Sequence, residues 1–132
     1  MTGNEFIILA GKLATSADEA SLRSAVSRAY YGAFHLSIQF LNDIERPAPQ
    51  NANAHVYVAR QLQRSGQSDA FRAGSLLGDL HTDRIKADYR LDNPRVGKAV
   101  LARLCVERAN EIQAALHRCC AEPARSEIQS RL

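Results

Sequence analysis

The stretch from Ser16 to Asn42 limits the folds available to this chain more than any other. Ser16 and Glu19 match the S-x-x-E capping box, in which each side chain satisfies a free backbone N–H of the first helical turn. No proline follows until Pro47. We therefore expect one long helix that ends near residues 43–45, because Pro47 and Pro49 cannot continue it.

This long helix has one broad apolar side and one narrow polar stripe. At 100° per residue the apolar side is wide enough to pack against more than one neighbouring helix; it comprises Leu22, Val26, Ala29, Tyr30, Ala33, Leu36, Ser37, Phe40, Leu41 and Ile44. The polar stripe comprises Ser24, Arg28, Tyr31, His35, Gln39 and Asn42. Arg28 and His35 share that stripe, two turns and roughly 10 Å apart along the axis.

The rest of the chain also reads as helical. Apolar spacing, proline, glycine and capping residues predict further helices over about 4–15, 53–64, 68–90 and 93–119. Gly66 is expected to close the second of these, and Asn93 with Pro94 to open the last. We expect an all-α domain over residues 1–121, built as an antiparallel up-and-down bundle of four to five helices. Residues 122–132 form a polar tail that is a candidate for disorder.

Charge and cysteine content argue against a strongly basic nucleic-acid binder, a disulfide-stabilised protein and a zinc protein. The formal net charge is +3, from 17 Lys and Arg against 14 Asp and Glu, which is far from the basic stripe of a dedicated nucleic-acid binder. Three cysteines, two of them adjacent, fit neither a disulfide framework nor a zinc site. We expect a cytoplasmic protein with no metal, no cofactor and no membrane segment, since neither a signal peptide nor a long apolar run is visible.

The first constellation with chemical potential is Arg28, Tyr31 and His35. A histidine can act as general base or acid near neutral pH, and an arginine can hold a phosphate with its planar fork. Together they suit metal-free phosphodiester chemistry on RNA. The structural alternative is that Arg28 pairs with a carboxylate and His35 contacts a neighbouring helix.

The second constellation lies at the end of the helix predicted over 68–90. It comprises His81, Asp83, Arg84, Lys86, Asp88 and Tyr89. The functional interpretation is that Asp88 holds Arg84 beside a polar cleft, which the first stripe also lines. The structural interpretation is a solvated i,i+4 ion pair between Arg84 and Asp88. His55 and His117 receive no role.

Two motifs together resemble HEPN domains, the higher eukaryotes and prokaryotes nucleotide-binding domains. They are L-R-S-A-V-S-R-A-Y-Y-G-A-F-H (Leu22–His35) and L-H-T-D-R-I-K-A-D-Y (Leu80–Tyr89). The likeness spans roughly residues 5–120 and is greatest to small stand-alone prokaryotic members with A-Y-Y-x-A-F-H and R-x-x-A-D-Y-like segments. It implies a helical bundle that commonly forms a homodimer.

For many family members the resemblance also implies metal-independent RNA cleavage in toxin–antitoxin or other defence systems. Active members carry an R-x4-6-H motif late in the bundle, where this chain has Arg84 followed by Asp88 and Tyr89. Arg28 and His35 fit R-x6-H in the earlier helix. We expect an RNA- or nucleotide-engaging protein, with Arg28, His35 and Arg84 as catalytic candidates and Tyr31, His81, Asp88 and Tyr89 as binding candidates. The alternative is a non-catalytic dimeric module that binds a nucleotidyltransferase-like antitoxin or another protein.

Overall fold

The computed structural model describes residues 1–132, and every regular element in it is helical. The prediction of an all-α chain is therefore confirmed. The elements are α1 (Gly3–Leu13), α2 (Glu19–Asp43), α3 (Ala54–Gln63), α4 (Ser68–Tyr89), the short 3₁₀ turn η1 (Arg95–Gly97), α5 (Ala99–Cys119) and α6 (Ala124–Arg131).

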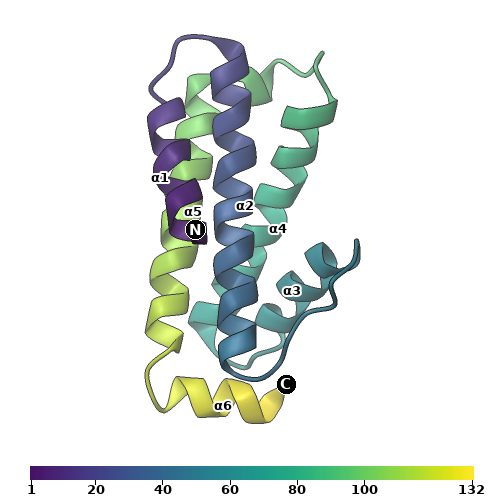
Figure 1. The fold of residues 1–132 in the computed structure, drawn as a ribbon, viewed down its shortest axis with the longest axis vertical. Coiled ribbons are helices and arrows are strands. Elements are labelled where there is room, and N and C mark those ends of the chain that lie inside the picture. Colours follow the sequence, from purple (N-terminus) through teal and green to yellow (C-terminus); the bar gives the residue numbers. More distant parts are fainter.

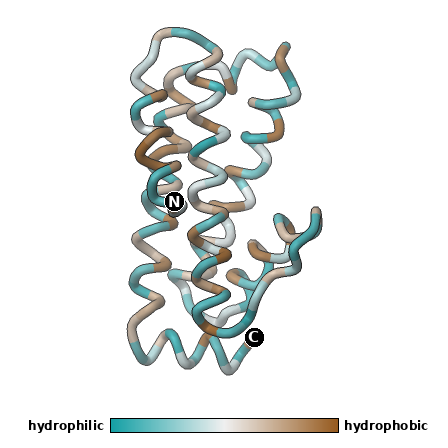
Figure 2. Tube along the Cα trace, in the orientation of Figure 1, coloured by the Kyte–Doolittle hydropathy of each residue, from teal (hydrophilic) through white to brown (hydrophobic).

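Helix α2 is the central column of the bundle and packs against α1, α4 and α5 (Figure 1). Helices α1 and α4 run in one direction, and α2 and α5 run in the other (Figure 1). The shorter α3 packs mainly on α4, and α6 crosses the lower end of the bundle. Figure 2 shows apolar and polar residues alternating along each helix, as expected where one face of every helix is buried.

The N-terminus of α2 differs from the predicted capping box. Asp18, not Ser16, is the N-cap: its Oδ1 accepts the Ser21 N–H at 2.8 Å. The Ser16 hydroxyl instead donates to Asp18 Oδ2 at 2.7 Å. These hydrogen bonds, with that of Ser16 the largest contribution, lower the pKa of the Asp18 carboxyl. A carboxylate beside the positive end of the helix dipole is the stronger cap, so the start moves along the chain.

The C-terminus of α2 falls at Asp43, where proline was expected to stop it. Glu45 adopts a left-handed conformation with φ of 61°. The Arg46 N–H then bonds the Leu41 carbonyl at 2.8 Å, and the Glu45 N–H bonds that of Asn42 at 3.0 Å. This is a Schellman ending, so the chain reverses before Pro47 is reached.

The expected start of the last long helix is wrong. The Asn93 side chain accepts the Arg95 N–H at 3.0 Å just before η1, whose N-cap is Pro94, and α5 begins only at Ala99. Most of the polar tail belongs to the helix α6. Its Ile128 is fully buried against the bundle, which explains why so polar a segment is ordered.

A pair of glycines lets α1 lie unusually close to α2. A Cβ atom placed on Gly32 would lie 2.6 Å from Ile7 Cγ1 and 2.8 Å from the Gly3 carbonyl oxygen. No side chain fits at either position without moving one helix, so the glycines set how closely Phe6 of α1 approaches α2.

Candidate functional site

Two arginines from different helices lie over the same tyrosine ring. Arg84 of α4 places its Cζ 4.9 Å from the centre of the Tyr31 ring, and Arg28 of α2 places its Cζ at 5.2 Å. Arg28 also lies 5.1 Å from the ring centre of Phe6 in α1. The two predicted constellations therefore meet, and Tyr31 is where they join.

Asp88 holds this group together from the end of α4. Its Oδ2 lies 2.9 Å from Arg84 Nε and accepts the Ser27 hydroxyl at 3.1 Å. The Nε–H of Arg84 is not aligned with Oδ2, so this contact is an ion pair rather than a directed hydrogen bond. The side chain of Arg84 is only 14% exposed. The predicted i,i+4 ion pair between Arg84 and Asp88 is thus present, but it is half-buried beside Tyr31 rather than solvated.

His35 and Tyr89 extend the site outward at its two ends. His35 is exposed and stacks on Phe6 with ring centres 5.7 Å apart and planes 22° apart. Its ring centre is 6.3 Å from that of Tyr31. Tyr89 is 65% exposed and its ring lies 5.5 Å from Arg84 Cζ. The result is a row of aromatic faces with guanidinium groups between them.

A stacked pair of histidines lies on the inner side of Arg84. The rings of His55 and His81 are 5.0 Å apart and parallel within 2°. His55 Nδ1 is hydrogen-bonded to the Tyr30 hydroxyl at 2.5 Å, and the Tyr30 ring stacks on His81 at 5.1 Å. His81 was a predicted binding residue, whereas His55 was given no role. Nothing in its local spacing pairs it with His81, because the two positions meet only when α3 packs on α4.

Both imidazoles are biased towards the neutral form. Burial is the main cause of the lowered pKa of His55, and the positive charge of Arg84 adds to it. For His81, burial again lowers the pKa most, followed by His55 and Arg84. Burial also raises the pKa of the Tyr30 hydroxyl. At neutral pH the inner part of the site therefore offers uncharged hydrogen-bonding groups beneath a cationic rim.

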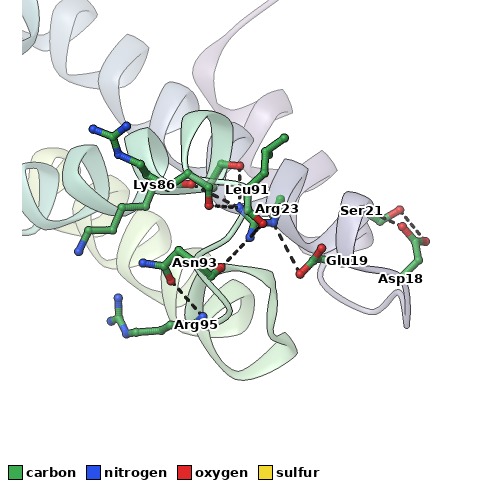
Figure 3. A network of polar contacts seen from close by, with 10 residues as sticks. Asp18, Glu19, Ser21, Arg23, Lys86, Leu91, Asn93 and Arg95 are labelled. Atoms are coloured by element: carbon green, nitrogen blue, oxygen red, sulfur yellow. Dashed lines mark hydrogen bonds and ion pairs between the residues drawn. The ribbon is translucent and has the colours of Figure 1, made fainter.

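Arg23 fixes the end of α4 against α2, a role that was not predicted from its position in the sequence. It is 7% exposed, and its guanidinium donates to the carbonyl oxygens of five residues, at distances from 2.6 to 3.3 Å. These acceptors are Lys86, Ala87, Arg90, Leu91 and Asn93. Figure 3 shows the side chain reaching from α2 into the turn that follows α4. Arg84 and Asp88 are thereby held opposite Arg28 and Tyr31.

Asp83 does not belong to the site, although it lies within the second predicted constellation. It is buried and paired with Arg95 at 2.9 Å and with Arg108 at 3.5 Å. It therefore ties α4 to η1 and α5 on another side of the helix.

The site is a surface with hollows beside it rather than a deep cleft. Arg28, Tyr31 and Arg84 lie outside the hollows that surround the site. One hollow adjoins Phe6 and His35, and another adjoins Phe34 and His55. Such a shape suits an extended chain better than a compact ligand.

Comparisons with protein-family models, with curated proteins and with solved structures gave no match. No helix is both long and apolar enough to cross a lipid bilayer. No group of three or more His, Cys, Asp or Glu side chains is arranged to hold a metal ion.

Proposed function

We propose that this protein is a HEPN-like, RNA-engaging protein of a prokaryotic defence or toxin–antitoxin system. The observation that carries the proposal is the position of Arg28 and Arg84 over the Tyr31 ring, with Cζ 5.2 and 4.9 Å from its centre. Alternating guanidinium and aromatic groups bind unpaired RNA well, because arginines meet phosphates while rings stack on bases. The motifs around Arg28 and Arg84 are those that resemble HEPN domains.

The same residues support a metal-independent endoribonuclease reaction. In it the 2′-hydroxyl oxygen attacks the neighbouring phosphorus, the P–O5′ bond breaks, and a 2′,3′-cyclic phosphate and a 5′-hydroxyl result. His35 takes the proton from the 2′-hydroxyl, and solvent water protonates the departing 5′ oxygen. Arg28 or Arg84 stabilises the charge that gathers on the phosphate oxygens. Asp88 orients Arg84, while Tyr31, His81 and Tyr89 contact the strand.

One observation favours a second function, a non-catalytic dimeric module with a nucleotidyltransferase-like or other protein partner. The late segment places Asp88 against Arg84 at 2.9 Å, where active family members would carry a histidine. An arginine already neutralised by a carboxylate binds phosphate less strongly.

The experiment measures binding and cleavage of single-stranded RNA in EDTA by the wild type and three variants, Arg28→Ala, Arg84→Ala and His35→Ala. Each arginine variant should weaken binding and reduce the salt slope by about 1, because one phosphate contact is lost. His35→Ala should bind RNA and fail to cleave it. Arg103→Ala is the matched control. It removes the same positive charge, and Arg103 is exposed on α5, away from the site.

Cleavage by His35→Ala at the wild-type rate would remove His35 from the mechanism. RNA binding by the wild type with no cleavage would favour the non-catalytic module. Equal losses in Arg103→Ala and Arg84→Ala would show that only net charge matters, and the proposed site would then be wrong.

A further inference from the structure

A cavity of about 260 Å³ opens beside the arginine site, between α2, α3 and the loop that joins them. Figure 1 shows this loop running from the lower end of α2 to the start of α3. Phe34, Ile38 and Asn42 line the cavity from α2, and His55 lines it from the first turn of α3. The loop contributes the segment from Pro47 to Asn51.

The walls of the cavity are apolar, and its polar groups are all uncharged. The walls are formed by proline, alanine, isoleucine and phenylalanine side chains. The polar groups are three carboxamides and one imidazole, which belong to Asn42, Gln50, Asn51 and His55. No Lys, Arg, Asp or Glu side chain lines it. The Phe34 and His55 rings, which both line the cavity, stack on each other at 4.6 Å. This combination suits a planar, uncharged heterocycle that offers both donors and acceptors.

His55 connects the cavity to the arginine site. One side of its ring stacks on Phe34 in the cavity, and the ring also stacks on His81 at 5.0 Å, next to Arg84. The charge of Arg84 is close enough to lower the pKa of the His55 imidazole. A ligand with a base in the cavity and a phosphate at Arg84 would therefore span neighbouring parts of one surface.

We propose that this cavity is a specificity pocket for one unpaired adenine base of the RNA strand that Arg28 and Arg84 contact. The inference rests on the proposed function for the strand. A carboxamide places a donor and an acceptor side by side, which matches adenine N6 and N7. Guanine is best matched by an arginine or lysine, and cytosine by a carboxylate, and the lining holds none of these.

Base preference is tested with five-nucleotide oligouridines whose central position is A, U, C or G, by fluorescence anisotropy. The oligonucleotide with central adenine should bind about tenfold more tightly than the other three, because one bidentate base contact discriminates by about that much. Equal affinity for all four, or a preference for any other base, would overturn the proposal.

Filling the cavity is the second test. Ala48→Phe places a ring in it, since Ala48 lines the wall, whereas Ala52→Phe adds the same ring at an exposed position of the same loop. Ala48→Phe should lose the preference for adenine and keep the wild-type affinity for plain oligouridine. Ala52→Phe should keep both. A preference that survives in Ala48→Phe would place adenine recognition elsewhere.

A measurement on mononucleotides separates this inference from the proposed function. Adenosine monophosphate should shift the side-chain amide NMR signals of Asn42 and Asn51, uridine monophosphate should not, and the exposed Asn110 on α5 should stay unchanged. If no RNA binds but these shifts occur, the proposed function fails and the pocket stands. If RNA binds without base preference and the shifts are absent, the function stands and the pocket proposal fails.

Discussion

At the scale of single residues, Arg23 has a large expected effect on stability. We predict that Arg23→Ala lowers the free energy of unfolding by about 3 kcal/mol, because buried carbonyl oxygens lose a charged donor. Arg23→Lys should recover part of this loss, since an ammonium lacks the planar fork that reaches five acceptors. Urea unfolding of both variants measures this. The exposed Arg103→Ala should change stability by less than about 0.5 kcal/mol.

The histidine pair makes stability depend on pH below about 6.5. The pKa of His55 and of His81 is lowered in the folded protein, mainly by burial, so the unfolded chain binds more protons than the folded one. The full stability is therefore present above the histidine pKa of the unfolded chain, about 6.5. It is lost as the pH falls from there through the lower pKa values that His55 and His81 have in the folded protein. The charge of Arg84, which faces both rings, acts in the same direction.

We predict that the wild type loses stability between pH 7.5 and pH 5, and that His81→Phe loses less. Phenylalanine keeps the stacking surface and removes the ionisable group. Urea unfolding at the two pH values measures the difference. His117→Phe, at an exposed position of α5, should retain the wild-type pH dependence; an equal change in both variants would contradict this account.

At the scale of helices, the contact between α1 and α2 depends on Gly32. We predict that Gly32→Ala lowers stability by about 1–3 kcal/mol, because the added methyl group overpacks the contact with Ile7 and Gly3. Gly78→Ala is the matched control in α4, where a Cβ atom meets nothing within 4 Å. It should raise stability by up to about 1 kcal/mol through helix propensity alone. Thermal unfolding followed by circular dichroism tests both.

Helices were predictable from the sequence where local signals agreed, and less so where two signals competed. The apolar spacing of α2 and Pro47 fixed its extent to within a few residues. At its start, however, Ser16 and Asp18 both have capping side chains, and the choice depends on the folded geometry. Asn93 bonds the first N–H of η1 rather than starting α5, because an asparagine side chain can serve a 3₁₀ turn as well as an α-helix. Helix α6 was hard to predict because its sequence is mostly polar and only one of its side chains, Ile128, is buried.

At the scale of the whole molecule, the candidate site is assembled from four helices. Phe6 comes from α1, Tyr31 from α2, His55 from α3 and Arg84 from α4. The sequence predicted the members on α2 and α4, since each group lies within a few helical turns. The contributions of Phe6 and His55 were not predictable, because they depend on how α1 and α3 pack against the central helix.

Helix α6 joins the lower ends of the bundle. Arg125 donates to the Asp43 carbonyl at 2.8 Å, Arg131 donates to that of Arg64 at 3.3 Å, and Ile128 is buried beneath them. We predict that Ile128→Ala lowers stability by about 2–5 kcal/mol, the range for truncating a buried isoleucine. Ser130→Ala, at an exposed position of α6, should have little effect. Denaturant unfolding compares them, and equal stabilities would mean that α6 is dispensable.

The Arg23 contacts have a consequence for how this chain tolerates mutation. Within α2 its guanidinium pairs with Glu19 Oε1 at 3.8 Å, but its hydrogen bonds to α4 and the following turn all go to backbone oxygens. The side chains of the exposed acceptor residues Arg90 and Leu91 therefore take no part in these hydrogen bonds. A deep mutational scan should therefore find almost every substitution harmful at position 23 and most substitutions neutral at position 91. Among related sequences that have diverged, we expect the arginine at position 23 to be kept, while the side chains of the turn after α4 vary.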